Sequence, residues 1–355
     1  MAEEYSAKSI LKDDILEVIN SQCPIETLAE TCVLVTGATG LIGAQVVKTL
    51  LYANRECGYN IRVLAFCRSA EKFQRVFSDF AGDSRLIPVF GDINCEIDVV
   101  EKVDYIIHGA SATSSKYFVE YPIETIMTAV KGTRNILEFA SKKKIKSMIY
   151  LSSLEVYGIP NTSNGTVRED QYGYIDPMSV RSSYSEGKRI AECLCVAYMK
   201  EKSVPVKIAR LSQTFGPGVE YNDGRVFAEF ARCAVEKRDI VLHTNGKTVR
   251  TYCYTKDAVA ALIYILIKGK SGEAYNVSNE ETAISICDMA SLVCEVFAES
   301  GISVKYDIPV NVSEFGYNPE MIIRLDTSKL KKLGWKATVG LRDMYIRMIQ
   351  SFETR

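Results

Sequence analysis

The sequence predicts an α/β protein: a doubly wound parallel sheet carries helices on both faces, and a smaller C-terminal α/β lobe completes the fold. Short runs rich in β-branched residues alternate with stretches of helical periodicity. That alternation is typical of a parallel sheet, because each return to the same edge needs a crossover, usually a helix. The predicted strands begin at Cys32, Arg62, Leu86, Asp104, Ser147 and Val204.

A helical segment precedes the first strand. Within residues 1–30, apolar side chains recur at helical spacing, which predicts an amphipathic helix. Its apolar face can pack on the core or on a partner subunit, and the pattern does not choose between them. The apolar residues are Ile10, Leu11, Ile15, Leu16 and Ile19.

Composition excludes several classes of protein. The 355 residues carry a net charge of −1, which gives no electrostatic case for binding nucleic acid or a membrane surface. No apolar run reaches the roughly 18–20 residues that cross a bilayer, and the acidic N-terminal segment does not resemble a secretory signal. The 11 cysteines are scattered, without disulfide or metal-site spacing. We therefore expect a cytoplasmic protein with free thiols and no bound metal.

A glycine-rich turn follows the first predicted strand and opens a helix, in the pattern G-x-x-G-x-x-G. Backbone N–H groups at a helix N-terminus can hold a pyrophosphate where no side chain intervenes. The turn therefore predicts a Rossmann-type dinucleotide site. The residues expected to contact the dinucleotide here are Gly37, Thr39, Gly40, Leu41, Ile42 and Gly43.

The end of the second strand bears on the choice of cofactor. A carboxylate there commonly holds the ribose 2′-hydroxyl of NAD, but this strand runs into Arg68. An arginine can accept a 2′-phosphate, which favours NADP over NAD, although a solvated surface arginine is the alternative. We also expect cofactor contacts from Asp92 and Ile93 after the third strand, and from Ala110 and Ser111 after the fourth.

Tyr184 and Lys188 lie four residues apart in a helical stretch, so they share one helix face. A tyrosine has a pKa of about 10 and is a poor base near neutral pH. A lysine ammonium one turn away, with a positive nicotinamide ring, is expected to lower that pKa. Ser153 ends the fifth strand, where its hydroxyl can bind the same substrate oxygen, with Ser152 as the alternative. The set predicts hydride transfer from a substrate hydroxyl to a nicotinamide that Tyr184 and Lys188 also contact.

These patterns divide the chain into regions. We expect residues 31–212 to form the NAD(P)-binding Rossmann domain, with residues 250–285 returning to it. Residues 1–30 form an N-terminal helical extension. The more irregular segments 213–249 and 286–355 suit a small substrate-binding lobe that closes over a ligand.

From about Thr31 to Trp335 the chain resembles the extended short-chain dehydrogenase/reductases, the NAD-dependent epimerase/dehydratase family that modifies nucleotide sugars. The resemblance rests on TGATGLIG, GDI, HGAS, SSLEVYG, YSEGK, FGPG, VRTYCYTKDAVAAL, AYNVSN and DTSKLKKLGW. The nearest patterns are those of UDP-glucuronate decarboxylases and dTDP-glucose 4,6-dehydratases. The resemblance implies that Ser153, Tyr184 and Lys188 carry the hydride chemistry.

The residues after Ser153 bear on the reaction. The resemblance implies that 4,6-dehydratases have an Asp-Glu pair there as acid and base, whereas this chain has Leu154 and keeps Glu155. Decarboxylases have Ser-Glu, so Glu155 and Arg250 match their functional residues while Leu154 again departs. Glu155 is thus a candidate catalytic residue. We expect remodelling through a transient keto sugar, of epimerase or dehydratase type, with decarboxylation as the alternative.

The resemblance also implies substrate contacts and an assembly. Gln213 stands where relatives usually have an asparagine on the diphosphate, and Arg225 and Arg250 can meet phosphate or sugar oxygens. Ala129 replaces a common helix asparagine. The helices at 124–142 and 185–201 correspond to those that pair two subunits, which predicts a homodimer. Two rival functions remain: net NAD(P)-dependent oxidation or reduction of a nucleotide-linked sugar or alditol, and non-catalytic sensing of NADP.

Overall fold

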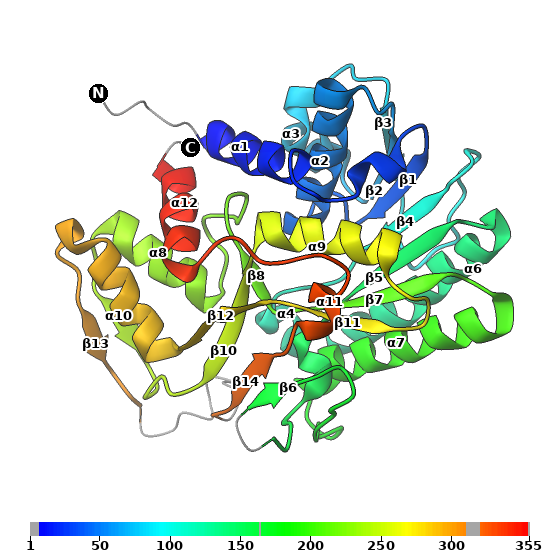
Figure 1. Cartoon of the computed structure of the whole chain (residues 1–355). Coiled ribbons are helices and arrows are strands. Elements are labelled where there is room, and N and C mark those ends of the chain that lie inside the picture. Colours follow the sequence, from blue (N-terminus) through cyan, green and yellow to red (C-terminus); the bar gives the residue numbers. More distant parts are fainter. Residues whose placement is uncertain (1–6, 163–164, 310–319, 354–355) are drawn as a thin grey trace.

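A seven-stranded parallel sheet forms the centre of the molecule (Figure 1). The computed structural model describes residues 7–162, 165–309 and 320–353. The strand order is β11-β7-β5-β4-β1-β2-β3, which confirms the doubly wound prediction. The strands are β1 (Cys32–Thr36), β2 (Arg62–Cys67), β3 (Leu86–Phe90), β4 (Tyr105–His108), β5 (Ser147–Ser153), β7 (Val206–Leu211) and β11 (Ala274–Val277). The last of these, at one edge, was not among the predicted strands.

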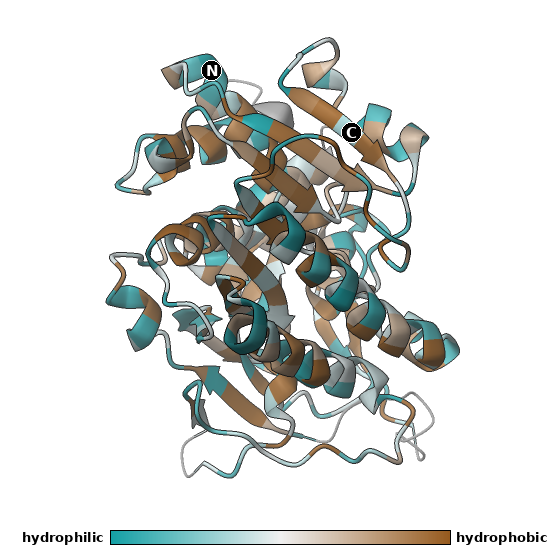
Figure 2. Ribbon diagram, turned by 90° about the vertical axis from the view of Figure 1, so that its right-hand side faces the viewer, coloured by the Kyte–Doolittle hydropathy of each residue, from teal (hydrophilic) through white to brown (hydrophobic). Residues whose placement is uncertain are grey.

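Helices bury both faces of this sheet, which explains its continuous apolar strands. Val33 and Val35 of β1 face one cluster, with side chains from α2 (Leu41–Cys57) and α9 (Thr255–Lys268). Leu34 faces the opposite cluster, with side chains from α6 (Thr133–Lys143) and α7 (Ser182–Lys202). Figure 2 shows hydrophobic strands between helices that are apolar on one side.

A second sheet lies beside the first. It contains β12 (Asn279–Ser285), β10 (Val249–Tyr254), β14 (Ile322–Leu325) and β6 (Thr166–Val167), and β8 (Gln213–Phe215) also pairs with β10. Helices α8 (Val226–Glu236), α10 (Ile286–Val296) and α12 (Leu341–Glu353) enclose its apolar cluster. β9 (Ile240–Leu242) and β13 (Val304–Tyr306) form a small parallel pair. The chain thus returns to the first sheet through α9 and β11, whereas β10 belongs to the second.

The N-terminal helix α1 (Ala7–Ile19) packs on its own chain, against α2, α9 and α12 (Figure 1). Its Asp14 is buried and accepts a hydrogen bond of 2.5 Å from the Tyr254 hydroxyl at the end of β10. Arg347 of α12 pairs with the same carboxylate. The helix therefore joins the two sheets on one side of the molecule. None of the described helices has the length and apolar character needed to cross a membrane.

Shorter helices complete the fold, and one of them alters an expected element. The helix predicted over residues 124–142 is α5 (Pro122–Met127), a π-helical turn η3 (Thr128–Gly132) and α6. Ala129 of that turn packs against Gly187, where a Cβ would lie 3.1 Å from it. The remaining helices are η1 (Ile25–Leu28), α3 (Ala70–Val76), η2 (Ser78–Phe80), α4 (Ser115–Glu120), η4 (Leu154–Tyr157), η5 (Ala298–Ser300) and α11 (Ser328–Lys331).

Candidate active site

The glycine-rich turn lies between β1 and α2, beside the point where the strand order reverses. Gly37 has φ of +69°, and a Cβ there would lie 2.8 Å from the carbonyl carbon of Gly109. A Cβ on Gly43 would lie 2.2 Å from the carbonyl oxygen of Gly37. The turn at Gly37 therefore has no room for a side chain beside the crevice between β1 and β4, where doubly wound folds bind ligands, and Gly43 lets α2 pack closely on the turn. A large cleft of about 2380 Å³, called the main cleft here, opens at this turn. Thr39, Gly40 and Leu41 line it, and the neighbouring Ile42 is half-buried.

The other residues predicted to bind a cofactor follow the carboxyl ends of β2, β3 and β4. Arg68 is exposed directly after β2. Asp92 accepts a hydrogen bond of 2.8 Å from the Asn94 backbone and so caps a turn, while Ile93 is buried. The Ala110 backbone donates to Thr36. Ser111 is half-buried and donates to the carbonyl of Ala112. They surround the crevice, and their contact with a cofactor stays a prediction.

The fold brings Ser153, Tyr184 and Lys188 together. Ser153 is the last residue of β5, and its side chain is near enough to Tyr184 of α7 to lower the pKa of the phenol. The Lys188 ammonium is buried, donates to the carbonyl oxygen of Leu151 at 2.7 Å, and lies 5.6 Å from the centre of the Tyr184 ring. A phenol, a hydroxyl and an ammonium thus converge at the carboxyl end of the sheet, as proton transfer requires.

Burial governs the acidities of these groups. It raises the pKa of the Tyr184 phenol well above its usual value, and the Glu155 charge adds to that. The Ser153 side chain and the charges of Arg181 and Arg225 oppose it. In the protein alone the net shift of this pKa is upward, because burial outweighs the favourable contacts. The lowering expected from Lys188 together with a nicotinamide ring stays a prediction. Burial also lowers the pKa of Lys188 to about 8.

Glu155 lies next to this group and is held at both carboxylate oxygens. Arg181 donates to one oxygen at 2.9 Å, and the Ser185 hydroxyl donates to the other at 3.1 Å. Leu154, by contrast, is buried in a small apolar cluster with Val156 and Tyr157 and the residues of β6 and β14. Its position therefore supplies no second acid, and one carboxylate stands beside the phenol.

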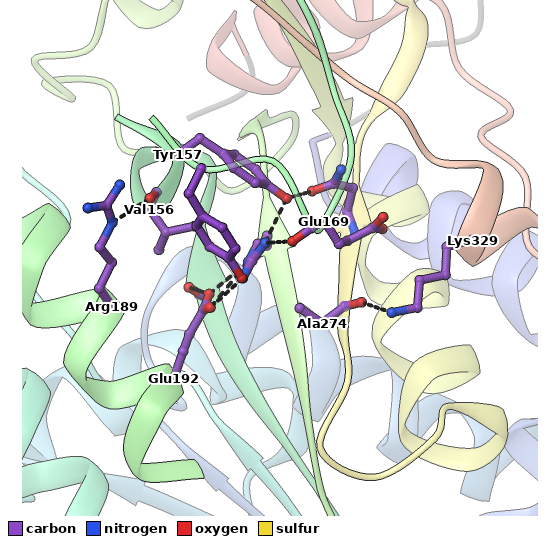
Figure 3. Close-up of polar contacts among 11 residues, drawn as sticks. Val156, Tyr157, Glu169, Arg189, Glu192, Ala274 and Lys329 are labelled. Atoms are coloured by element: carbon purple, nitrogen blue, oxygen red, sulfur yellow. Dashed lines mark hydrogen bonds and ion pairs between the residues drawn. The ribbon is translucent and has the colours of Figure 1, made fainter. Parts of the chain in front are cut away.

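A buried polar network supports the end of β5 (Figure 3). Ser152, Arg210 and Asn276 are cross-strand neighbours on β5, β7 and β11. Ser152 donates to Glu192 at 2.6 Å, and Arg210 forms an ion pair with the same carboxylate at 2.7 Å. Arg210 also donates to the Tyr157 hydroxyl, which donates to Asn276. Charged and polar groups therefore satisfy one another across three strands.

Two successive turns of α7 form hydrogen bonds with two successive residues of β5. Lys188 bonds the Leu151 carbonyl, and Glu192, one turn later, accepts from Ser152. Ser153 follows directly, so its position relative to Tyr184 depends on both contacts. Ser152, the alternative to Ser153 in the sequence, donates its hydroxyl hydrogen bond to Glu192, and the role of Ser153 stays a prediction.

The predicted substrate residues line the same main cleft as the glycine-rich turn. Arg225 precedes α8 and forms a bidentate pair with Asp223, the shorter contact being 2.6 Å. Arg250 of β10 is buried, and the Met321 sulfur, at 3.7 Å, is its guanidinium's one hydrogen-bond partner within the described residues. Gln213 begins β8 in the same wall. Ser153, Tyr184 and Lys188 do not line the cleft themselves, but Arg181 beside them does.

Sequence reasoning missed Arg181 and Phe118. The Phe118 ring of α4 stacks on the Tyr184 ring, with the ring centres 4.2 Å apart. The Arg181 guanidinium lies 5.1 Å from the centre of the Phe118 ring. Arg181 precedes Tyr184 by three residues, a spacing that puts both on one helix face and was a usable signal. Phe118 comes from a distant segment, and its sequence context carries no such signal.

Comparison with known proteins agrees with this architecture. Residues 33–278, more than half of the chain, match the model of the NAD dependent epimerase/dehydratase family. UDP-glucuronic acid decarboxylase 1 of Xenopus tropicalis is 30% identical over 342 residues, which cover 93% of this chain and 74% of that protein.

Solved structures share the fold at lower identity. UDP-glucose 4-epimerase of Thermotoga maritima, solved with UDP-glucose, has a TM-score of 0.76 at 22% identity, covering 91% of this chain and 98% of that one. UDP-glucuronic acid 4-epimerase of Bacillus cereus, solved with UDP-glucuronic acid and NAD, has a TM-score of 0.75 at 22% identity. The match covers 91% of this chain and 99% of that one.

Proposed function

This chain belongs to the NAD-dependent epimerase/dehydratase family, and on that premise we propose that it remodels a nucleotide-linked sugar through a transient keto intermediate. One observation carries the proposal: Ser153, Tyr184 and Lys188 converge at the carboxyl end of the central sheet, beside a glycine-rich crevice. A non-catalytic NADP sensor would have no need for this group.

The side chains have distinct roles in this proposal. The Tyr184 oxygen takes the proton of a sugar hydroxyl, and Ser153 hydrogen-bonds the same oxygen. The Lys188 ammonium stabilises the phenolate by its charge. A bound dinucleotide supplies the hydride acceptor and a positive ring, which offsets the upward pKa shift that burial gives Tyr184. A dinucleotide held by the glycine-rich turn would accept the hydride and give it back to the remodelled sugar, so the overall reaction would be redox-neutral.

Epimerisation and decarboxylation are the two candidate outcomes. The single carboxylate, Glu155, and the burial of Leu154 support epimerase-type chemistry over water loss, which needs both an acid and a base. The similarity to UDP-glucuronic acid decarboxylases supports decarboxylation. Both outcomes begin with the same oxidation by the group around Tyr184.

We propose that the cofactor is NAD or NADP, held by the glycine-rich turn and the residues after β2, β3 and β4. Arg68 and the lack of a carboxylate at the end of β2 support NADP. The NAD in the structure of the Bacillus cereus relative supports NAD. Mass spectrometry of the nucleotides released on denaturation, together with binding titrations of both dinucleotides, would distinguish NAD from NADP. Arg68→Gln should weaken NADP binding and leave NAD binding unchanged.

We assign substrate binding to Gln213, Arg225 and Arg250. Gln213 and Arg225 belong to the region 213–249, which we propose forms the substrate-binding lobe together with 286–355, and Arg250 follows that region on β10. Arg250 is the leading candidate for the diphosphate, because a buried guanidinium whose one hydrogen-bond partner among the described residues is a sulfur has donors left for phosphate oxygens. We also propose a cytoplasmic setting, which the scattered free cysteines support.

The test is an assay with UDP-, dTDP-, GDP- and CDP-sugars. Products are identified by mass spectrometry and NMR, while absorbance is followed at 340 nm. We expect one sugar to be converted without a steady absorbance change, and Tyr184→Phe to lower the rate about 100-fold or more with cofactor binding intact. Steady production of reduced cofactor would instead indicate a net dehydrogenase. A protein that converts no sugar in the panel would contradict the proposal.

A further inference from the structure

Arg181 is held at a fixed place beside the catalytic phenol. Its guanidinium lies 5.1 Å from the centre of the Phe118 ring, which stacks on the Tyr184 ring at 4.2 Å and 9°. The Ser183 hydroxyl donates to the Phe118 carbonyl at 3.1 Å, which joins α4 to the start of α7. A positive charge is therefore held against the ring that stacks on the Tyr184 ring.

The donors of this guanidinium are only partly used. An arginine has five N–H donors in a planar fork, and Arg181 gives one hydrogen bond, to Glu155, within the part of the chain that the structure describes. Its side chain is 18% exposed and lines the main cleft. Arg225, in contrast, donates two guanidinium hydrogen bonds to the Asp223 carboxylate. Arg181 is thus a cation with donors left for a ligand at the catalytic end of the cleft.

We propose that Arg181 binds a carboxylate on the sugar and so makes the protein selective for nucleotide-linked sugar acids over neutral sugars. This inference rests on the proposed function and adds the substrate class and the residue that selects it. A guanidinium fork matches a carboxylate in two parallel hydrogen bonds. A neutral hydroxymethyl group at the same carbon would leave most of those donors unpaired.

Glu155 opposes the preference for an acid and makes that preference depend on Arg181. Its carboxylate would repel a substrate carboxylate, and the ion pair with Arg181 at 2.9 Å reduces that repulsion while leaving other donors of Arg181 available. Replacing Glu155 by its neutral isostere should therefore strengthen the preference for an acid. Removing the arginine should abolish that preference, because Glu155 is then uncompensated.

Calorimetric binding to the Tyr184→Phe protein tests this, since the variant holds substrate without turning it over. The three ligands are UDP, UDP-glucose and UDP-glucuronate, and the two sugars differ only in the group at C6. We expect UDP-glucuronate to bind about tenfold or more tighter than UDP-glucose, as a charged hydrogen-bonded contact provides. Adding Arg181→Met should bring that ratio to about one, with UDP affinity unchanged, and Glu155→Gln should raise it.

Arg168→Met is the matched control, because Arg168 is an exposed arginine, paired with Asp170, that does not line the cleft. It should leave the ratio unchanged. A parent protein that binds both sugars equally would overturn the inference and leave the proposed function standing. A preference that survives Arg181→Met, or is equally lost in Arg168→Met, would also overturn it. Failure of all three ligands to bind would overturn this inference, which the experiment ties to a uridine nucleotide, and would leave the proposed function to the panel of four nucleotide sugars.

Discussion

Lys188 and Lys207 are both buried, and burying a charged side chain costs stability. Lys188 lies at the carboxyl end of the central sheet, and Lys207 lies near the amino end of β7, where it donates to Ser147 at 2.6 Å. Burial lowers the pKa of each to about 8. Only Lys188 stands beside the catalytic phenol. The proposed chemistry therefore has a use for the buried charge of Lys188 and none for that of Lys207.

We predict that Lys188→Met and Lys207→Met each raise the free energy of unfolding at pH 7. The unfolded lysine has a pKa of 10.5 and the folded one about 8, so between these values the unfolded chain binds more protons. Each lysine thus makes stability rise with pH across that window, and its penalty is constant below pH 8. The methionine variants should lose this rise, measured by urea unfolding from pH 7 to 10.

Activity separates the two variants. Lys188→Met should lose about 100-fold or more of the rate, whereas Lys207→Met should keep it, because Lys207 is remote from the catalytic group. If both variants are less stable than the parent at pH 7, the hydrogen bonds that these lysines make outweigh the cost of burying their charge.

At the scale of elements, α7 carries the catalytic pair and also the Glu192 carboxylate that anchors β5. Glu192 and Arg210 are both almost fully buried, with side chains 9% and 2% exposed. Leaving one charge of such a pair without its partner is costly, because the remaining charge stays in a poorly hydrated site. The geometry of Ser153 and Tyr184 therefore depends on an ion pair behind them.

We predict that Glu192→Gln lowers the free energy of unfolding by about 3–5 kcal/mol, since Arg210 is then buried without a counter-charge. Glu138→Gln is the control: Glu138 pairs with Lys202 at the partly exposed end of the same helix and should cost less than about 1 kcal/mol. Combining Glu192→Leu with Arg210→Met should recover much of the loss. Equal urea midpoints for Glu192→Gln and Glu138→Gln would contradict the prediction.

At the scale of the whole molecule, the sequence predicts those features that depend on residues close together in the chain. Strands buried on both faces are β-branched runs, and the Tyr184 and Lys188 positions follow from helical spacing. β11 is absent from the predicted strands because its four residues include Asn276, a polar residue whose side-chain partners, Tyr157, Val167 and Asp326, all lie far away in the sequence. The roles of Phe118 and Arg210 depend on partners distant in sequence, which no local pattern encodes.

An exposed apolar face bears on assembly. Ile123 of α5 is 76% exposed and Ile190 of α7 is 45% exposed, and the two helices pack on each other. Val119, Met127 and Val196 are also exposed on α4, α5 and α7. Two such helix pairs related by a two-fold axis would cover one another, because a two-fold interface joins the same patch on both copies.

We predict that the protein is a homodimer through this face, with a mass measured by light scattering twice that of the chain. Ile123→Glu with Ile190→Glu should give a monomer of unchanged circular dichroism, because both side chains are solvent-exposed in the single chain. Tyr306→Glu, on the exposed β13, should leave the dimer intact. The monomer should also lose activity, since α7 carries Tyr184 and Lys188 and would lose its packing partner. A parent that is already monomeric, or a double variant that stays dimeric, would place the interface elsewhere or remove it.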